Sequence, residues 1–339
     1  MASRKKNRKW AMELPDDLDA WTHRTMTSAA DNRHILTLPG DRRVSYAIFG
    51  DPSGRPVLCL HGAPSSRLMF SIADSEAKAA GLRLLAPDRP GCGETPPMEP
   101  VTLAARVAWL EEVVDALDLE RFAILAISGG GPYAVALAAK LGHRINGLAL
   151  VSPMGPVADY LATPESRNHP ISWSQHRFFL DVPRQRWLTR PIAETIGFVY
   201  RTVPWGLGGL VPRLISPADR NILSRPAVKT AMHRMTAESF RVSGRGGTDD
   251  LEIYSAPWGI RWSDVTAPSV LWQGTSDPIV PVAAALYLAA KLPNCRLVRL
   301  DGKGHFWIFD DVPRVIAELA DMAGTKPYSN DHDVMPHPP

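Results

Sequence analysis

The chain has 339 residues, of which 45% are hydrophobic and 22% charged, as in an ordinary globular protein that can bury a large core. The net charge of +3 and isoelectric point near 8.8 are too mild to indicate nucleic-acid binding without a clustered basic patch. Three scattered cysteines, Cys59, Cys92 and Cys295, form no disulfide framework and fit a reducing compartment. No signal peptide is visible at the start, so we expect a cytoplasmic protein.

Both ends of the chain lack a hydrophobic period. Residues 1–30 are polar with a basic run, and we expect a flexible extension; a localisation or polyanion-binding tag is the alternative. Residues 324–339 are predicted to be a disordered tail. The longest uncharged stretch, 122–139, is interrupted by SGGGPY, so we expect no stable membrane insertion.

The first predicted elements are strands. Residues 34–52 are predicted to form two strands joined by a Pro-Gly-Asp turn. The next strand, PVLCLH, ends in the motif His61-Gly62-Ala63-Pro64, and the strand LRLLAP ends in a loop that begins at Asp88. Apolar residues at helical spacing then predict a helix over 101–118.

The stretch 122–139 is predicted to be a buried strand, an abrupt turn at Ser128 and an alanine-rich helix. Small residues lie two positions on either side of the serine, at Ala126 and Gly130, where larger side chains would collide with backbone in a tight turn. Such a turn lifts the hydroxyl off the sheet and directs the helix N-terminus towards it.

This stretch resembles the nucleophile elbow of the α/β-hydrolase superfamily, G-x-S-x-G, with Ala126 in place of the first glycine. The resemblance extends over roughly residues 34 to 323. It implies the α/β-hydrolase fold, a mostly parallel central sheet flanked by helices with an inserted helical cap. For the motif alone, a glycine-rich connection in another parallel α/β domain is the alternative, whereas the Rossmann pattern G-x-G-x-x-G is missing here.

The motif His61-Gly62-Ala63-Pro64 resembles the oxyanion loop of the same superfamily. The resemblance implies that the backbone N–H groups of Ala63 and Gly129 form the oxyanion hole. The alternative is a plain turn with the histidine packed inside. The loop from Asp88 to Gly93 resembles the family's D-R-x-G-x-G loop, which implies structural roles for Asp88 and Arg89.

Residues 154–264 change in character, with many prolines and helix-length apolar patterns but no clear strands. They resemble the helical cap that the family inserts after the sixth strand, which divides the core into 31–153 and 265–323. Aromatic side chains there predict an apolar pocket over Ser128 or, alternatively, the core of the cap itself. A membrane-surface helix within 192–214 is a lesser alternative. The region contains five tryptophans: Trp173, Trp187, Trp205, Trp258 and Trp262.

The sheet pattern resumes after the cap. The strand PSVLWQG is followed by Asp277, a helix is predicted over 282–291, and the strand CRLVRL is followed by a loop that reaches His305. A last helix is predicted over 313–322. Since open α/β sheets place ligands at the carboxyl ends of their strands, these two residues and Ser128 are expected at one edge.

Ser128, Asp277 and His305 follow the order of serine, acid and histidine that α/β-hydrolases use. In that arrangement the histidine takes the serine proton and the aspartate orients the imidazole. Four other carboxylates are rivals for the acid: Asp159, Asp301, Asp310 and Asp311. The remaining histidines show no metal-ligand spacing, and neither a metal nor a cofactor is expected.

The resemblance thus implies a serine hydrolase that cleaves carboxylic esters or related acyl substrates through an acyl-enzyme on Ser128. We expect a small, largely apolar substrate and no nucleic acid. Alternatives within enzymes are an aminopeptidase, a C–C bond hydrolase, a lactonase, a thioesterase and a cofactor-free haloperoxidase. A small-molecule-binding or receptor-like protein with incidental turnover is the alternative outside enzymes, along with an interaction protein that acts through its basic N-terminus.

Overall fold

The computed structural model describes residues 32–202 and 215–324. The flexible extension predicted for 1–30 lies outside the described residues, as do all but the first residue of the predicted tail at 324–339 and residues 203–214 of the predicted cap.

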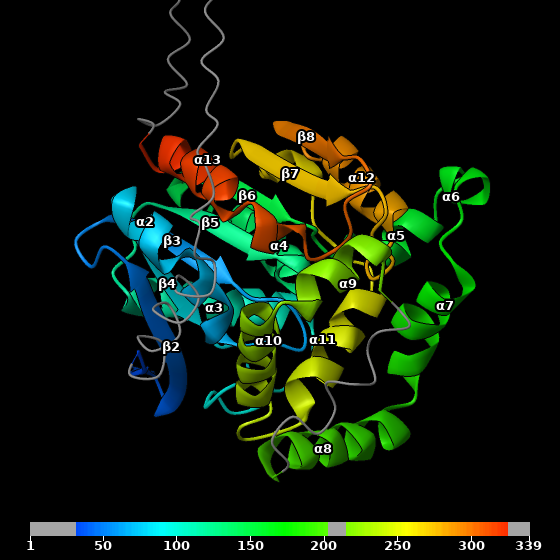
Figure 1. The fold of residues 1–339 in the computed structure, drawn as a ribbon, viewed down its shortest axis with the longest axis horizontal. Helices are drawn as coiled ribbons and strands as arrows, with labels where there is room; N and C mark the ends of the chain where they lie inside the picture. The colour runs from blue at the N-terminus through cyan, green and yellow to red at the C-terminus, as the bar shows by residue number, and fades with distance from the viewer. Residues whose placement is uncertain (1–31, 203–214, 325–339) are drawn as a thin grey trace, which may run out of the picture.

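The described residues form an eight-stranded sheet in the order β1-β2-β4-β3-β5-β6-β7-β8 (Figure 1). The strand β1 pairs antiparallel with β2, and β2 pairs antiparallel with β4, whereas all other neighbours are parallel. The prediction of a mostly parallel sheet is therefore confirmed. The strands are β1 His34–Leu38, β2 Arg42–Gly50, β3 Arg55–Leu60, β4 Leu82–Pro87, β5 Phe122–Ile127, β6 Ile145–Val151, β7 Ser269–Gly274 and β8 Cys295–Leu300.

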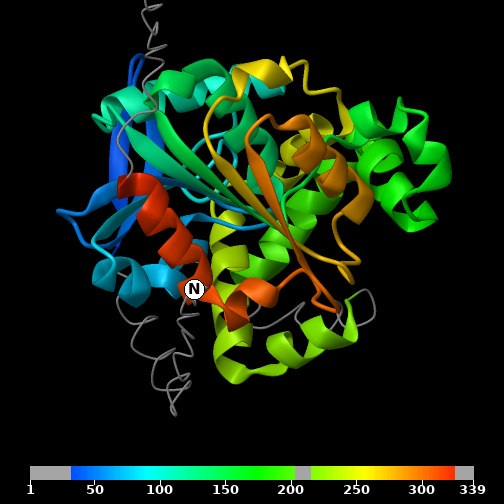
Figure 2. The same cartoon turned by 90° about the horizontal axis from the view of Figure 1, so that it is seen from above.

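Helices cover both faces of the sheet, as Figure 2 shows. One layer consists of α2 (Asp74–Ala79), which lies against β2 and β4, and α13 (Val312–Gly324), which lies against β3, β5 and β6. The other layer consists of α3 (Leu103–Ala116), α4 (Gly131–Leu141) and α12 (Val282–Lys291). Because both faces are covered, every residue of β5 and of β7 is buried, which explains their continuous apolar runs.

The predicted core helices are present with small differences in their ends. The helix predicted over 282–291 matches α12, and α13 extends slightly beyond the predicted 313–322 at both ends. The helix predicted over 101–118 is shorter, at Leu103–Ala116. Its start is set by Thr102, whose hydroxyl accepts from the backbone N–H of Ala105, and its end is followed by Asp118 at a φ of 53°.

A helical insertion separates β6 from β7, and the described part of residues 154–264 contains no strand. Its longer helices are α8 (Arg186–Thr202), α9 (Pro217–Ser224), α10 (Pro226–Ser239) and α11 (Arg245–Ser255); the short ones are α5 (Val157–Leu161), α6 (Glu165–Asn168) and α7 (Trp173–His176). Among the described helices, none has the length and apolar character needed to span a bilayer.

The tryptophans of the insertion divide into two groups. Trp258 is buried and packs near the half-buried Trp262, at 6.1 Å between ring centroids, as expected for an internal core. Trp173 and Trp187, in contrast, are 77% and 78% exposed. For these two residues the prediction of a pocket lining or a cap core is wrong, because α7 and α8 turn them towards solvent; Trp205 lies outside the described residues.

Candidate active site

Ser128 occupies the abrupt turn between β5 and α4. Its φ is 53°, in the left-handed region that a non-glycine residue adopts at a cost, and a 3₁₀ turn over Ser128–Gly130 leads directly into α4. The turn needs small neighbours. A side chain at Gly130 would collide with the Leu60 carbonyl oxygen of β3, and one at Gly131 would lie 2.8 Å from the Pro153 Cβ. Ala126 is fully buried at the end of the strand, so a methyl group is accommodated there.

His305 lies between Ser128 and Asp277. Its Nε2 is 3.0 Å from the Ser128 Oγ, and its Nδ1 is 2.7 Å from the Asp277 Oδ2. The three residues follow β5, β7 and β8, so the structure brings together at one edge of the sheet the three side chains that the sequence singled out.

The Asp277 carboxylate has hydrogen-bond donors on both oxygens. Its Oδ1 accepts from the backbone N–H groups of Ile279 at 2.8 Å and Val280 at 3.1 Å, while its Oδ2 also accepts from the Gln273 amide at 3.1 Å. An ionised carboxylate is an acceptor only, so it requires the Nδ1 of His305 to carry the proton. The Nε2 is then free to accept the serine proton.

The pKa of His305 is raised above its usual value. Burial alone lowers it, but the charge of Asp277 and the hydrogen bond to it, together with the charge of Asp219, outweigh the burial. The environment therefore stabilises an imidazolium, the form that His305 takes after it accepts a proton.

The rival carboxylates lie away from the imidazole. Asp159 accepts the backbone N–H of Trp258 at 3.0 Å. The other three lie at or near the surface on the last loops of the core, exposed or paired with arginine side chains: Asp301, Asp310 and Asp311. Only Asp277, among the five candidates, is hydrogen-bonded to His305.

Asp219 of α9 holds the loop that carries His305, and the sequence analysis missed it. Its carboxylate accepts the backbone N–H groups of His305 at 2.9 Å and of Phe306 at 2.8 Å. The Ser216 hydroxyl donates to the same carboxylate at 2.8 Å, and Asp219 is fully buried. The carboxylate of Asp219, a residue of the insertion, thus fixes the backbone of His305.

Ser152, which directly follows β6, also binds the loop that carries His305. Its hydroxyl donates to the His305 carbonyl oxygen at 3.3 Å and accepts from the Trp307 indole N–H at 3.0 Å. Ser152 is fully buried and has a φ of 42°. The sequence carried no signal for this role beyond the position of the serine at a strand end.

The loop after β3 lies against the Ser128 turn. A Cβ built on Gly62 would be 3.3 Å from the Ser128 Cβ, and one built on Gly129 would be 3.3 Å from the Ala63 Cβ. The histidine of this loop is fully buried. His61 donates from Nδ1 to the Gly62 carbonyl at 2.8 Å and accepts the backbone N–H of Arg89 at Nε2, and burial with the charge of Arg89 holds its pKa well below the usual value. It is a neutral, structural histidine.

Arg89 binds the backbone of the loop after β3. Its guanidinium donates to the carbonyl oxygens of His61 and, at 3.0 Å, of Gly62, and it forms a buried ion pair with Asp250 of α11 at 2.5 Å. The Tyr133 hydroxyl, from α4, also donates to Asp250. The predicted structural role of Arg89 agrees with these contacts.

Helix α11 also contacts the Ser128 turn directly. The Tyr254 hydroxyl donates to the Gly129 carbonyl oxygen at 2.9 Å. A side chain at Gly129 would collide with that hydroxyl, so a larger residue there would displace Tyr254. The peptide that follows the serine is thereby held from the insertion as well as from the core.

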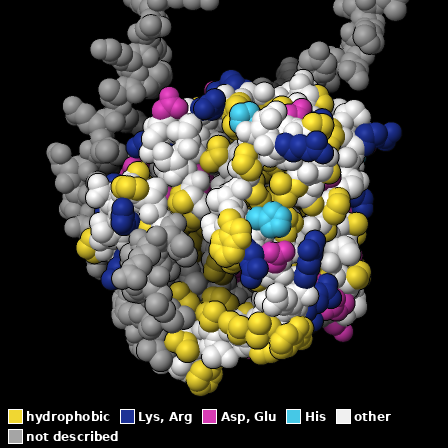
Figure 3. Space-filling view, turned by 90° about the vertical axis from the view of Figure 1, so that its right-hand side faces the viewer, with side chains coloured by type: hydrophobic (Ala, Val, Ile, Leu, Met, Phe, Trp, Pro, Cys, Tyr) yellow, Lys and Arg dark blue, Asp and Glu magenta, His cyan; other side chains and the backbone are white. Residues whose placement is uncertain are grey.

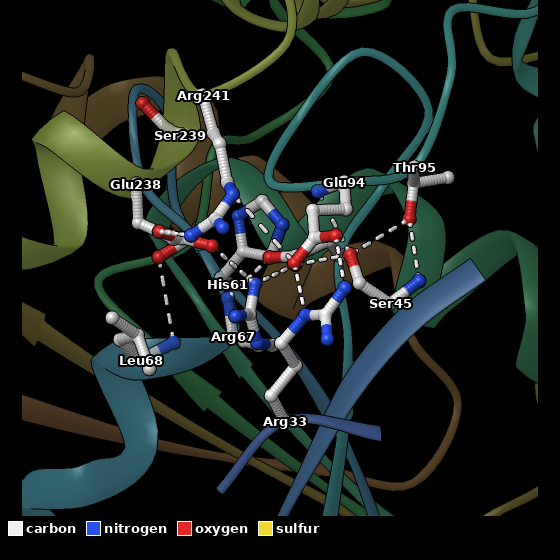
Figure 4. Close-up of polar contacts among 12 residues, drawn as sticks. Arg33, Ser45, His61, Arg67, Leu68, Glu94, Thr95, Glu238, Ser239 and Arg241 are labelled. Atoms are coloured by element: carbon white, nitrogen blue, oxygen red, sulfur yellow. Dashed lines mark hydrogen bonds and ion pairs between the residues drawn. The ribbon is translucent and has the colours of Figure 1, made fainter. Parts of the chain in front are cut away.

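A second buried network joins the core to α10 through Arg67 and Glu238 (Figure 4), and Asp88 belongs to it. Its carboxylate accepts from the Ser45 hydroxyl at 2.7 Å and pairs with Arg67 at 2.5 Å. Arg67 pairs in turn with Glu238 of α10 at 2.7 Å. Burial raises the pKa of Asp88, against the charge of Arg67 and its hydrogen bonds. As predicted, Asp88 occupies a structural position.

Residues 32–202 and 215–324 contain no group of three or more histidine, cysteine or acidic side chains placed to hold a metal ion. The chemistry that the arrangement can supply is that of a hydroxyl activated by an imidazole, with backbone N–H groups nearby.

Comparison with known proteins places this arrangement in a family. The chain is 27% identical over 228 residues to the pimeloyl-[acyl-carrier protein] methyl ester esterase of Aromatoleum aromaticum, covering 67% of this chain and 81% of that protein. It is 26% identical over 293 residues to the 2-hydroxy-6-oxononadienedioate/2-hydroxy-6-oxononatrienedioate hydrolase of Cupriavidus pinatubonensis, covering 83% of this chain and 91% of that protein.

Solved structures share the fold. A thermophilic esterase from Thermogutta terrifontis superposes with a TM-score of 0.59 at 21% identity, covering 86% of this chain and 99% of that one. The family model of the alpha/beta hydrolase family matches residues 57–319. This range includes the strands from β4 to β8 and the residues Ser128, Asp277 and His305. The chain belongs to the alpha/beta hydrolase family.

Proposed function

We propose that the protein is a serine hydrolase that forms an acyl-enzyme on Ser128 and resolves it with water. The observation that carries the proposal is the continuous hydrogen-bonded path from Ser128 through His305 to Asp277, with distances of 3.0 and 2.7 Å. A free serine hydroxyl is a poor nucleophile, and a base within hydrogen-bond reach is the requirement for its activation.

In this mechanism the Nε2 of His305 accepts the Ser128 proton as Oγ attacks the substrate carbonyl. The imidazolium keeps its Nδ1–H on Asp277 and then donates the Nε2 proton to the leaving group. Water repeats the sequence on the acyl-enzyme, with His305 again as base. The raised pKa of His305 supports this assignment, because it favours the protonated intermediate state.

The developing oxyanion would bind to the backbone N–H groups of Ala63 and Gly129. The close approach of their two loops supports this assignment. Arg89 and Tyr254 bond to carbonyl groups of those loops and would keep the donors in place before the reaction begins. One such donor is worth about 3–4 kcal/mol of barrier height.

The substrate we propose is a small to medium, largely apolar carboxylic ester. Apolar side chains next to the serine turn and the imidazole support it: the Met69 Cε is near Gly62, and the Phe306 ring packs edge-on against His305 at 5.2 Å. The name of the Aromatoleum aromaticum relative also points to an ester. The name of the Cupriavidus pinatubonensis relative makes hydrolysis of a 2-hydroxy-6-oxodienoate the second candidate.

A panel of p-nitrophenyl esters of increasing acyl length tests the proposal. Ser128→Ala and His305→Ala should each lose turnover by a factor of roughly 10⁴ or more, and by similar amounts, because the residues act as a unit. Ser276→Ala, an exposed serine beside Asp277, is the matched control and should retain full activity. Retained turnover in either site variant would overturn the assignment. Slow turnover with tightly retained product would favour a receptor-like role instead.

A further inference from the structure

Helix α8 packs on the protein through its charged face. Arg186 forms an ion pair with Glu252 of α11, and Arg190 lies 3.5 Å from the buried Asp249 of the same helix. Glu194, two turns after Arg186, accepts hydrogen bonds from the loop that precedes α11. These residues recur at four-residue spacing and therefore share one side of the helix, which faces inward.

The opposite side of α8 is apolar and exposed. Leu188, Ile192 and Ile196 form a stripe at four-residue spacing, flanked by Trp187 and Phe198, which are 78% and 60% exposed. We term these five residues the α8 face. No charged side chain lies among the residues of this side of the helix, and Figure 3 shows hydrophobic side chains gathered over α8 along the lower edge of the molecule. An amphipathic helix that turns its apolar side to solvent indicates a surface meant to be covered.

The charges near α8 indicate which kind of surface covers the α8 face. Residues 173–202, which include α8 and the turns before it, contain five arginines and two carboxylates, and two of the arginines, Arg186 and Arg190, are paired with carboxylates of α11 on the inward side. Arg177 and Arg184, in the turns before α8, are 57% and 76% exposed and share a single carboxylate, Asp181, at 3.8 Å, which leaves an excess of positive charge at the N-terminal end of α8. A second copy of the chain would bring like charges together at this surface. An anionic surface would meet opposite ones.

We propose that the α8 face docks on an anionic phospholipid surface. Trp, Phe, Leu and Ile side chains on one side of a helix, with exposed arginines before its N-terminus and low overall hydrophobicity, are the features of a helix that lies in the plane of a membrane interface. The apolar side chains would enter the region between headgroups and acyl chains, and Arg177 and Arg184 would remain at the lipid phosphates. Docking does not depend on the reaction at Ser128.

Co-sedimentation of the full chain with phosphatidylcholine vesicles, with and without phosphatidylglycerol, tests the proposal. The wild type should bind the vesicles that contain phosphatidylglycerol, and the I192E/F198E variant should bind them with a partition coefficient at least about tenfold lower. Both side chains are exposed, so the variant should fold as the wild type does, which circular dichroism checks. Leu297→Glu, an exposed leucine on β8, is the control and should bind as the wild type does.

Several outcomes would overturn the proposal. They are an absence of wild-type binding to anionic vesicles, equal binding by I192E/F198E and the wild type, or a dimer in sedimentation velocity that I192E/F198E abolishes without any vesicle binding. Equal binding to vesicles with and without phosphatidylglycerol would overturn the role of the arginines. Ser128→Ala should bind vesicles as the wild type does, so a failure of the proposed hydrolase activity leaves this test intact.

Discussion

The carboxylate of Asp219 accepts the backbone N–H of His305 at 2.9 Å, although the two residues belong to different parts of the fold. Asp219 lies in the first turn of α9 in the insertion, and His305 follows the last strand of the core. The contact supplies both position and charge, because Asp219 adds a second negative charge beside an imidazole that already faces Asp277.

We expect Asp219→Asn to lower kcat/KM by up to roughly 100-fold, the effect of a misplaced catalytic group. The acid limb of the pH profile should move to lower pH, because loss of the charge lowers the pKa of His305 and the neutral base persists to a lower pH. Glu194→Gln removes a carboxylate of the insertion that is not among the charges shifting the pKa of His305, so it should leave the limb unchanged. Reduced activity with an unmoved limb would restrict Asp219 to a role in folding.

Asp277→Asn should lower kcat by about 10⁴-fold, because an amide in this position favours the wrong imidazole tautomer. Steady-state kinetics on the best p-nitrophenyl ester would measure it. Asp301→Asn, at an exposed rival position, provides the comparison and should be close to wild type. The reverse pattern would assign the acid to Asp301.

Arg89→Met should lower the free energy of unfolding by about 3–5 kcal/mol, because it leaves Asp250 buried without its ionic partner. The double variant Arg89→Met/Asp250→Asn should recover part of this loss in urea denaturation. Its kcat should remain low, because the carbonyl groups of His61 and Gly62 still lack their donor. A double variant as unstable as the single one would contradict the coupling.

Asp249 should make stability depend on pH. Burial raises its pKa to about 6, against the charges of Arg245, Arg106 and Arg190. The folded protein therefore holds this proton more tightly than the unfolded chain, so the contribution of Asp249 to stability is greatest below about pH 4 and is lost as the pH rises through about 6. The unfolding free energy of the wild type minus that of Asp249→Asn should fall across this window in urea titrations. A constant difference would contradict the raised pKa.

The sequence predicted those parts of the site that depend on local chain geometry. A tight turn between a buried strand and a helix demands small residues around Ser128, and that demand is visible in the sequence as Ala126 and Gly130. Asp277 and His305 were singled out because each follows a predicted strand and because their order after Ser128 resembles that of the α/β-hydrolases. The structure brings all three together.

Contacts between the insertion and the core could not be predicted in this way. The partner of Asp219 is a backbone N–H group 86 positions away, and the segment from Ser216 to Asp219 has only the appearance of an ordinary helix start, which it also is. The sequence predicted helix-length apolar patterns in the region of α8 but not which side of the helix faces inward. That orientation depends on Glu252 and Asp249, two carboxylates of another helix.

The contacts of α11 limit how a ligand can reach Ser128. Asp250 of this helix pairs with Arg89, and Tyr254 binds the peptide that follows Ser128. Movement of the insertion as a rigid lid would therefore break a buried ion pair, at a cost of several kcal/mol. Helix α11 is therefore fixed against the core, and substrate has to reach Ser128 without displacement of this helix.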